Sequence, residues 1–311
     1  MPGLVRTHPL GSRGLLLDLH GSLAPCTLSC VFCPVSLRSH RHPVPSRPRL
    51  VQEVLDEVAA LLDAHAPGEV ELVSDDVLAF PGLLDLVTLL RGRGVAVRVT
   101  TPGFRLADGR LARHLAGAGV RVHLTLWSRD PATAAAITGV PDALERLAAG
   151  LAAAQAAGVE VELGTVLTAR NAHELADLAA WAGELGATTF TVRVFHPDIA
   201  APTPAYVDQY PDYAEVVRGL ARAVAAEGAP HLQVVNLPWC RVPLSLASAP
   251  GLRVLSAPNE ERFHPWAACE ACAVRAHCSG THPVYAARHG EAPPDPAAAA
   301  AAWEAQCDRL R

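Results

Sequence analysis

Strand-like and helix-like segments alternate through the first two thirds of the chain, and this order most narrows the choice of fold. Six segments have the β-branched or alternating character of strands. Helix-like segments stand between them, the clearest being the amphipathic pattern of VQEVLDEVAALL at 51–62. Strand–helix repeats of this kind predict a parallel sheet with right-handed crossovers. The predicted strands are 14–20, 69–73, 95–100, 120–126, 159–167 and 188–195.

The last four of these strands each have one apolar and one polar side. Side chains along a strand point alternately to its two faces. In the strand at 95–100, three valines oppose Arg98 and Thr100, and the next three strands repeat the pattern. Parallel strands covered by helices on both faces would be apolar throughout, and a closed eight-stranded barrel would be filled with branched aliphatic side chains.

We therefore predict an α/β fold, a partial (β/α)6 TIM-like barrel whose polar interior can hold a charged ligand. The alternative is an ordinary sheet whose polar face is solvated. One helix is expected to begin at NAHE, with Asn171 as its N-cap and Glu174 completing a capping box.

Composition bears on location and partners. The chain has 311 residues and a formal net charge of −5, and neither half is strongly basic, which argues against nucleic acid as the main partner. The N-terminal segment lacks the apolar run of a signal peptide, and no run of about 20 apolar residues could span a membrane. We therefore expect a cytoplasmic protein with no membrane partner. In that reducing compartment, clustered cysteines more often bind metal than form disulfides.

The segment PCTLSCVFCP places three cysteines within eight residues. Cys26, Cys30 and Cys33 follow the first predicted strand. Three thiolates suit a [4Fe–4S] cluster with one iron left open, whereas four would close the cluster as an electron carrier. The alternatives are cysteines that bind no metal, or a structural zinc site that His40 and His42 could complete.

With Phe32 before the last cysteine, Cys26, Cys30 and Cys33 resemble the signature of radical S-adenosylmethionine (radical SAM) enzymes, and the resemblance extends over roughly residues 12–200. That family has a partial (β/α)6 barrel. The resemblance implies that the open iron binds S-adenosylmethionine and that an electron from the reduced cluster cleaves its C–S bond. The products would be methionine and a 5′-deoxyadenosyl radical, which abstracts hydrogen from a substrate. An external electron donor such as a flavodoxin or ferredoxin is also implied.

Later segments resemble further parts of the radical SAM pattern in the expected order. SDD at 74–76 stands where the family has Gly-Gly-Glu, TTPG resembles its Thr-Asn-Gly, HLTLW its fourth-strand segment, and VLTARNAHEL its fifth-strand exit. The first two residues of SDD would hinder the close backbone approach that glycines allow. Asp76 aligns with the glutamate that receives the ligand's ammonium, and is one methylene shorter. The implied cofactor-binding residues are Ser74, Asp75, Asp76, Thr101, Thr125 and Arg193, and no side chain is assigned a catalytic role.

The region from residue 237 onward is rich in proline and turns and holds five of the eight cysteines. We predict a barrel over 1–236 and a small cysteine-rich C-terminal extension over 237–311. CEACAVRAHCSG resembles the SPASM or twitch extensions of many radical SAM enzymes, which carry auxiliary iron–sulfur clusters; His282 stands where a full SPASM domain has a further cysteine. Cys307 could replace Cys240 as a ligand, and a zinc site with His282 is the alternative. The simplest ligand set for one auxiliary cluster is Cys240, Cys269, Cys272 and Cys278.

The resulting prediction is a radical SAM enzyme of oxidoreductase or maturase type, acting on a peptide or on a cofactor or natural-product precursor. The alternative is a non-catalytic iron–sulfur-binding regulator or scaffold on a degenerate radical SAM fold. The departure at 74–76 favours the alternative, whereas the intact cysteine triad and the polar strand faces oppose it.

Overall fold

The computed structural model describes residues 6–10, 14–19, 26–33, 50–73, 76–196, 204–255, 266–289 and 295–311. The chain divides into two compact units, Met1–Thr125 with Ala134–Glu162 and Leu126–Thr133 with Leu163–Arg311. Ser74 and Asp75, two of the predicted cofactor contacts, lie outside the described residues, as do His40 and His42.

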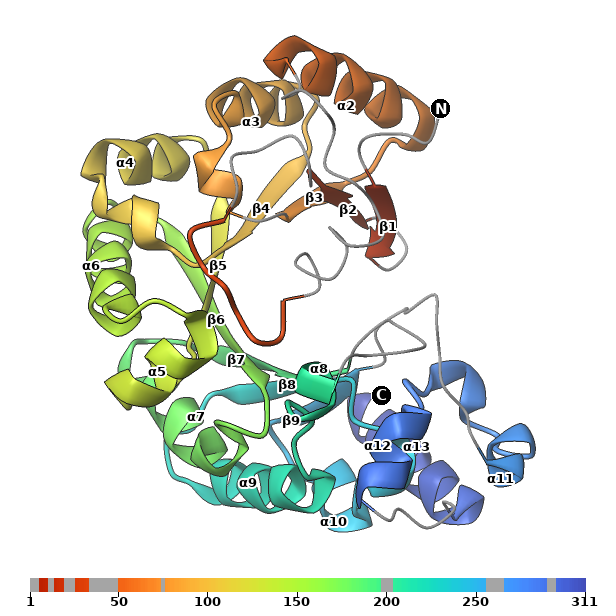
Figure 1. Ribbon diagram of the computed structural model, residues 1–311. Helices are drawn as coiled ribbons and strands as arrows, with labels where there is room; N and C mark the ends of the chain where they lie inside the picture. The colour runs from red at the N-terminus through yellow and green to blue at the C-terminus, as the bar shows by residue number, and fades with distance from the viewer. Residues whose placement is uncertain are drawn as a thin grey trace. The chain divides into compact units, whose positions relative to one another are not determined.

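The first unit is built on strands that pair in the order of the sequence. The strands are β1 (Arg6–Leu10), β2 (Gly14–Asp18), β3 (Glu69–Val73), β4 (Ala96–Thr101) and β5 (Arg121–Thr125). β1 is antiparallel to β2, and each later strand is parallel to the one before it. Helices lie along the outer side of these strands (Figure 1). They are α2 (Val51–His65), α3 (Leu83–Gly92), α4 (Gly109–Gly117) and α6 (Ala143–Ala156), with short 3-10 turns η1 (Val77–Ala79) and η2 (Phe104–Ala107).

The second unit continues the strand–helix alternation. β6 (Glu160–Leu167) begins in the first unit, and the parallel strands that pair after it are β7 (Thr189–Val194), β8 (His231–Val235) and β9 (Leu252–Leu255). Its helices are α7 (Leu175–Glu184), α8 (Pro204–Val207), α9 (Tyr213–Ala225), α10 (Leu244–Ala247), α11 (Ala267–Glu270), α12 (Pro283–His289) and α13 (Pro296–Leu310). The 3-10 turns are η3 (Ala172–Glu174), η4 (Trp239–Arg241) and η5 (Arg275–His277), and α5 (Pro131–Thr138) crosses the division between the units. Of the helices described, none is both long and apolar enough to cross a bilayer.

The two-sided character of the strands is confirmed. In β4, Val97 and Val99 are buried, whereas Arg98 and Thr100 on the opposite side are half-buried. The helix α3 packs against β4, and its Leu86 is fully buried. Burying a valine or leucine stabilises the fold by about 1.5–3 kcal/mol. Periodicity alone therefore gave the correct orientation of β4, and β5 and β7 show the same alternation of burial.

The predicted α/β class is confirmed, and the six predicted strands correspond to β2 through β7. β1, β8 and β9 were not predicted from the sequence. β1 contains Pro9, which lacks the N–H that a ladder needs, and β8 and β9 have only five and four residues. β9 lies beyond residue 236 and pairs with β8, which lies before it. The division into two functional regions at residue 236 stays a prediction.

Candidate functional site

The loop at 26–33 holds three half-buried cysteines close together. The Cys33 N–H donates to the Cys30 carbonyl at 3.0 Å, and the Leu28 N–H donates to Cys26 Sγ at 3.4 Å. Burial raises the pKa of the Cys30 thiol, and charge on Cys33 and Cys26 raises it further. Three thiols that repel one another as thiolates suit a cationic metal centre, which offsets that repulsion.

Two backbone hydrogen bonds attach this loop to the end of α5. The Ser29 N–H donates to the Thr138 carbonyl at 2.8 Å, and the Val31 N–H donates to the Ile137 carbonyl at 2.9 Å. Gly139 follows in the left-handed region, with φ +72°. A Cβ placed there would lie 3.1 Å from Ser29 Cβ. The position of the cysteines therefore depends on a residue far from them in the sequence.

We expect Gly139→Ala to reduce the iron bound by the first cysteine cluster after anaerobic reconstitution. The left-handed backbone costs an L-residue roughly 1–2 kcal/mol, and the added methyl also presses on Ser29. Gly158→Ala is the matched control, because Gly158 has φ +76° and nothing within 4 Å of an added Cβ. Equal iron contents in the two variants would contradict this account of the loop.

Asp76 and Thr101, both predicted cofactor contacts, lie in direct contact. Asp76 Oδ1 accepts hydrogen bonds from Thr101 Oγ1 at 2.8 Å and from the Leu78 N–H at 3.2 Å. Arg105 Nε lies 3.7 Å from Asp76 Oδ2. Burial raises the pKa of Asp76, and these three partners offset part of that rise. Asp76 is therefore also the N-cap of η1, which the sequence did not indicate.

Three of the predicted cofactor contacts, Thr101, Thr125 and Arg193, lie on three different strands. Thr101 is buried on the same side of β4 as Val99, opposite Arg98 and Thr100. Thr125 is half-buried at the end of β5, on the polar side with His123. Arg193 is exposed on the polar side of β7, in the second unit.

Ion pairs join the polar sides of the strands within the first unit. Arg98 lies 3.3 Å from Glu71 and 2.6 Å from Glu162, and Arg121 lies 3.0 Å from Glu162 and also pairs with Glu69. Each arginine is thus shared between two carboxylates. These ion pairs place buried and half-buried charged side chains on this part of the polar side, and a charged ligand held in the interior stays a prediction.

The pKa values of Glu162 and His123 in this network both lie below their ordinary values. His123 lowers the pKa of Glu162, and Arg98 and Arg121 lower it further, to about 2. Burial lowers the pKa of His123, and Arg98 acts in the same direction. The Arg98 guanidinium lies 3.0 Å from His123 Nδ1, which accepts its hydrogen bond when the ring is neutral.

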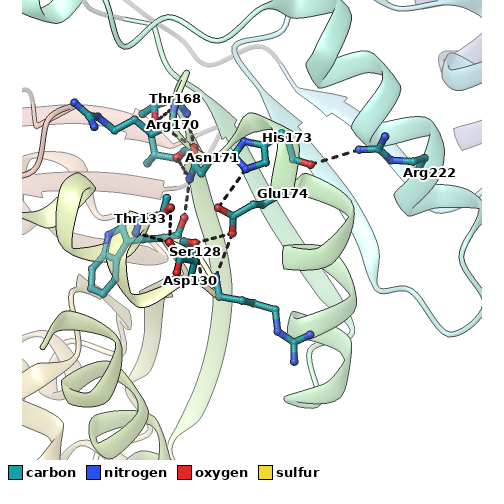
Figure 2. Close-up of polar contacts among 12 residues, drawn as sticks. Ser128, Asp130, Thr133, Thr168, Arg170, Asn171, His173, Glu174 and Arg222 are labelled. Carbon is teal, nitrogen blue, oxygen red and sulfur yellow. Dashed lines mark hydrogen bonds and ion pairs between the residues drawn. The ribbon is translucent and has the colours of Figure 1, made fainter. Parts of the chain in front are cut away.

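Asn171 and Glu174 do not form the expected capping box. Asn171 Nδ2 donates to the carbonyls of Trp127 and Val166, and its Oδ1 accepts from the Thr168 N–H at 2.8 Å. Figure 2 shows Glu174 directed instead toward Ser128, whose hydroxyl donates to it at 2.6 Å. Both side chains therefore tie the segment after β5 to the turn after β6.

The second group of cysteines lines one pocket of the second unit. Cys240 lies in η4, Cys269 in α11, and Cys278 directly after η5. Burial raises the pKa of Cys240 to about 12, with further contributions from Cys278 and Cys269. The pocket is lined by Cys240, Cys269, Cys272 and Cys278, together with Arg275 and Thr281.

Cys307 and His282, the other candidates for this site, are not among the residues that line the pocket. Cys307 lies half-buried in α13. His282 is fully buried, and its Nδ1 accepts a hydrogen bond from the Val284 N–H at 3.1 Å. Its ring packs near those of His196 and Tyr210. Cys240, Cys269, Cys272 and Cys278 therefore share one pocket, and their role as the ligand set of an auxiliary cluster stays a prediction.

Within the described ranges, no three His, Cys, Asp or Glu side chains are grouped so that they could hold a single metal ion. A [4Fe–4S] cluster does not require such convergence, because each thiolate binds a different iron. Both cysteine groups combine burial with mutual charge interaction, and their donor sets of three and four thiols fit clusters of that kind.

Comparison with known proteins gives relatives over part of the chain. GTP 3′,8-cyclase from Rhodopseudomonas palustris (strain TIE-1) is 32% identical over 168 residues, covering 52% of this chain and 47% of the relative. The chain therefore spans about half the length of the curated relative it matches.

Solved structures share the fold. Streptococcus suis SuiB bound to precursor peptide SuiA has a TM-score of 0.56 at 15% identity, covering 70% of this chain and 48% of SuiB. SuiB in a second crystal structure has a TM-score of 0.53 at 13% identity, covering 89% of this chain and 67% of SuiB. Native anSMEcpe with bound AdoMet and Kp18Cys peptide has a TM-score of 0.55 at 16% identity, covering 68% of this chain and 59% of that chain.

The family comparison agrees with the cysteine motif and with the strand order. The sequence pattern of the radical SAM superfamily matches residues 25–182, about half of the chain, beginning one residue before Cys26 and including β3 through β6. The chain belongs to the radical SAM superfamily.

Proposed function

We propose that this chain is an enzyme that cleaves S-adenosylmethionine reductively and abstracts hydrogen from a substrate. When bound by three thiolates, a [4Fe–4S] cluster with one open iron supplies the electron for that cleavage. The observation that carries the proposal is the grouping of Cys26, Cys30 and Cys33 in a half-buried loop fixed to α5.

The chain's own residues have three tasks in this proposal. Cys26, Cys30 and Cys33 hold the cluster, and the hydrogen bond from Ser29 to Thr138 fixes their loop. The Asp76 carboxylate accepts hydrogen bonds from the ammonium group of S-adenosylmethionine. Its buried position, with Thr101 fixing Oδ1, sets the carboxylate in one orientation before the ligand arrives.

An auxiliary iron–sulfur cluster on Cys240, Cys269, Cys272 and Cys278 completes the proposal. Four thiolates close such a cluster, so its role is electron transfer or structural support. An external donor such as a flavodoxin or ferredoxin supplies electrons to the protein. The four cysteines come from η4, α11 and the segments beside η5, and their grouping around one pocket supports this assignment.

A peptide is the substrate class we propose. The likeness to SuiB extends over 89% of this chain, and SuiB is a protein solved with its precursor peptide SuiA. The match to GTP 3′,8-cyclase covers 52% of this chain. The longer likeness leaves only about a tenth of this chain uncovered and so must extend beyond residue 236, and this favours a peptide-modifying enzyme over a nucleotide cyclase.

The test is an anaerobic assay of the reconstituted protein with a chemical reductant and S-adenosylmethionine. We expect 5′-deoxyadenosine to form and about eight irons to be bound, four for each cluster. Cys240→Ala should lower the iron to about half, whereas Cys307→Ala should leave it unchanged. Stoichiometric zinc on the C-terminal cysteines would reject the auxiliary cluster, and absence of 5′-deoxyadenosine would reject the enzymatic proposal.

A further inference from the structure

Two buried hydroxyls near the second cysteine group have no hydrogen-bond partner among the described residues. The side chains of Ser279 and Thr281 are each 1% exposed, and neither hydroxyl oxygen has a partner. Leaving a buried polar group unpaired destabilises the folded protein. Native proteins seldom keep such groups unpaired, so each points to a partner other than the side chains and backbone described.

Thr281 differs from Ser279 in its position relative to the pocket. Thr281 lines the pocket together with the four cysteines, whereas Ser279 is not one of its lining residues. Beside them, the Gly280 N–H donates to Cys278 Sγ at 3.4 Å. The segment after Cys278 thus already provides one donor to sulfur, and Thr281 brings a second donor to the same pocket.

We propose that the Thr281 hydroxyl donates a hydrogen bond to a sulfur of the auxiliary cluster and raises the reduction potential of that cluster. The proposal rests on the auxiliary cluster proposed above. Reduction adds negative charge to the cluster, so a donor at its sulfurs stabilises the reduced form more than the oxidised form. Thr281 is therefore a positioning and tuning residue rather than a ligand.

The experiment is a redox titration of the full-length reconstituted protein, followed by electron paramagnetic resonance of the auxiliary cluster. Thr281→Val removes the hydroxyl and keeps the shape of the side chain. At a fixed potential, the ratio of reduced to oxidised auxiliary cluster should fall about tenfold, equivalent to about 59 mV for a one-electron couple. Thr281→Ser should restore most of the wild-type ratio, because it returns the hydroxyl.

Ser279→Ala is the matched control, since it removes a buried, unpaired hydroxyl that does not line the pocket. Its auxiliary cluster should titrate as in the wild type. If Thr281→Val assembles poorly, Thr281→Ala removes the same hydroxyl without a second methyl group in the pocket. An unchanged potential in Thr281→Val or Thr281→Ala, with the cluster retained, overturns this proposal alone. A wild-type protein with only about four irons and a single cluster signal instead overturns the auxiliary cluster itself.

Discussion

Cys30→Ala should abolish the formation of 5′-deoxyadenosine in a reduced, anaerobic assay with S-adenosylmethionine. The first cluster has three thiolates to bind it, and removing one leaves too few to retain it with an open iron in place. Product measured by chromatography should fall to the background of a protein-free reaction. The iron content should fall by about four atoms, which is half of the expected total.

Two other cysteine variants separate this effect from a general loss of folding. Cys272→Ala should lose a similar amount of iron from the auxiliary site and still cleave some S-adenosylmethionine without turning over substrate. Cys307→Ala should keep the iron and the product, because Cys307 does not line the auxiliary pocket. Appreciable 5′-deoxyadenosine from Cys30→Ala would contradict the assignment of the first cluster.

Asp76→Ala should weaken the binding of S-adenosylmethionine by roughly 10- to 150-fold, with the iron content of the protein unchanged. A hydrogen bond between charged groups contributes about 1.5–3 kcal/mol, which corresponds to that range. Asp76→Asn should lose most of the same affinity, because it keeps the geometry and removes the charge. Titration of the ligand against each reconstituted variant, followed in the cluster spectrum, gives the dissociation constants.

Asp76 also caps η1, so the loss of a cap needs its own control. Asp108→Ala removes a comparable N-cap, the carboxylate that accepts a hydrogen bond from the Arg110 N–H at the start of α4. Losing such a cap typically costs about 0.5–2 kcal/mol of stability. The Asp108 variant should show that loss in chemical denaturation and bind the ligand normally. Unchanged binding in Asp76→Ala would favour the non-catalytic alternative.

Features set by local sequence were predictable, whereas features set by distant contacts were not. Strand faces follow from the alternation of side chains, so Val97 and Arg98 were assigned to opposite sides correctly. Thr101 follows the same alternation, because β4 continues one residue beyond its predicted end and puts that hydroxyl on the side of Val99. Asn171 has the sequence signature of a cap, but its Oδ1 accepts from the Thr168 N–H, and its Nδ2 donates to the carbonyls of Trp127 and Val166.

Local sequence also did not decide which cysteines bind the proposed auxiliary cluster. Cys240 and Cys307 lie on opposite sides of the CEACAVRAHC segment in the sequence, and spacing gave no reason to reject either. Tertiary contacts distinguish them, because Trp239 Nε1 donates to the His277 carbonyl at 2.9 Å. That bond holds η4, and with it Cys240, beside the turn that leads to Cys278.

The ion pairs on the polar side of the first unit constrain how this sequence can diverge. Because Arg98 pairs with both Glu71 and Glu162, replacing it alone would remove the ion pair of Glu71 and leave Glu162 with Arg121. Removing one member of a buried ion pair is usually far more harmful than replacing the whole group. Substitutions at positions 71, 98 and 162 should therefore be accepted in combination, and these positions should covary among descendants of a common ancestor.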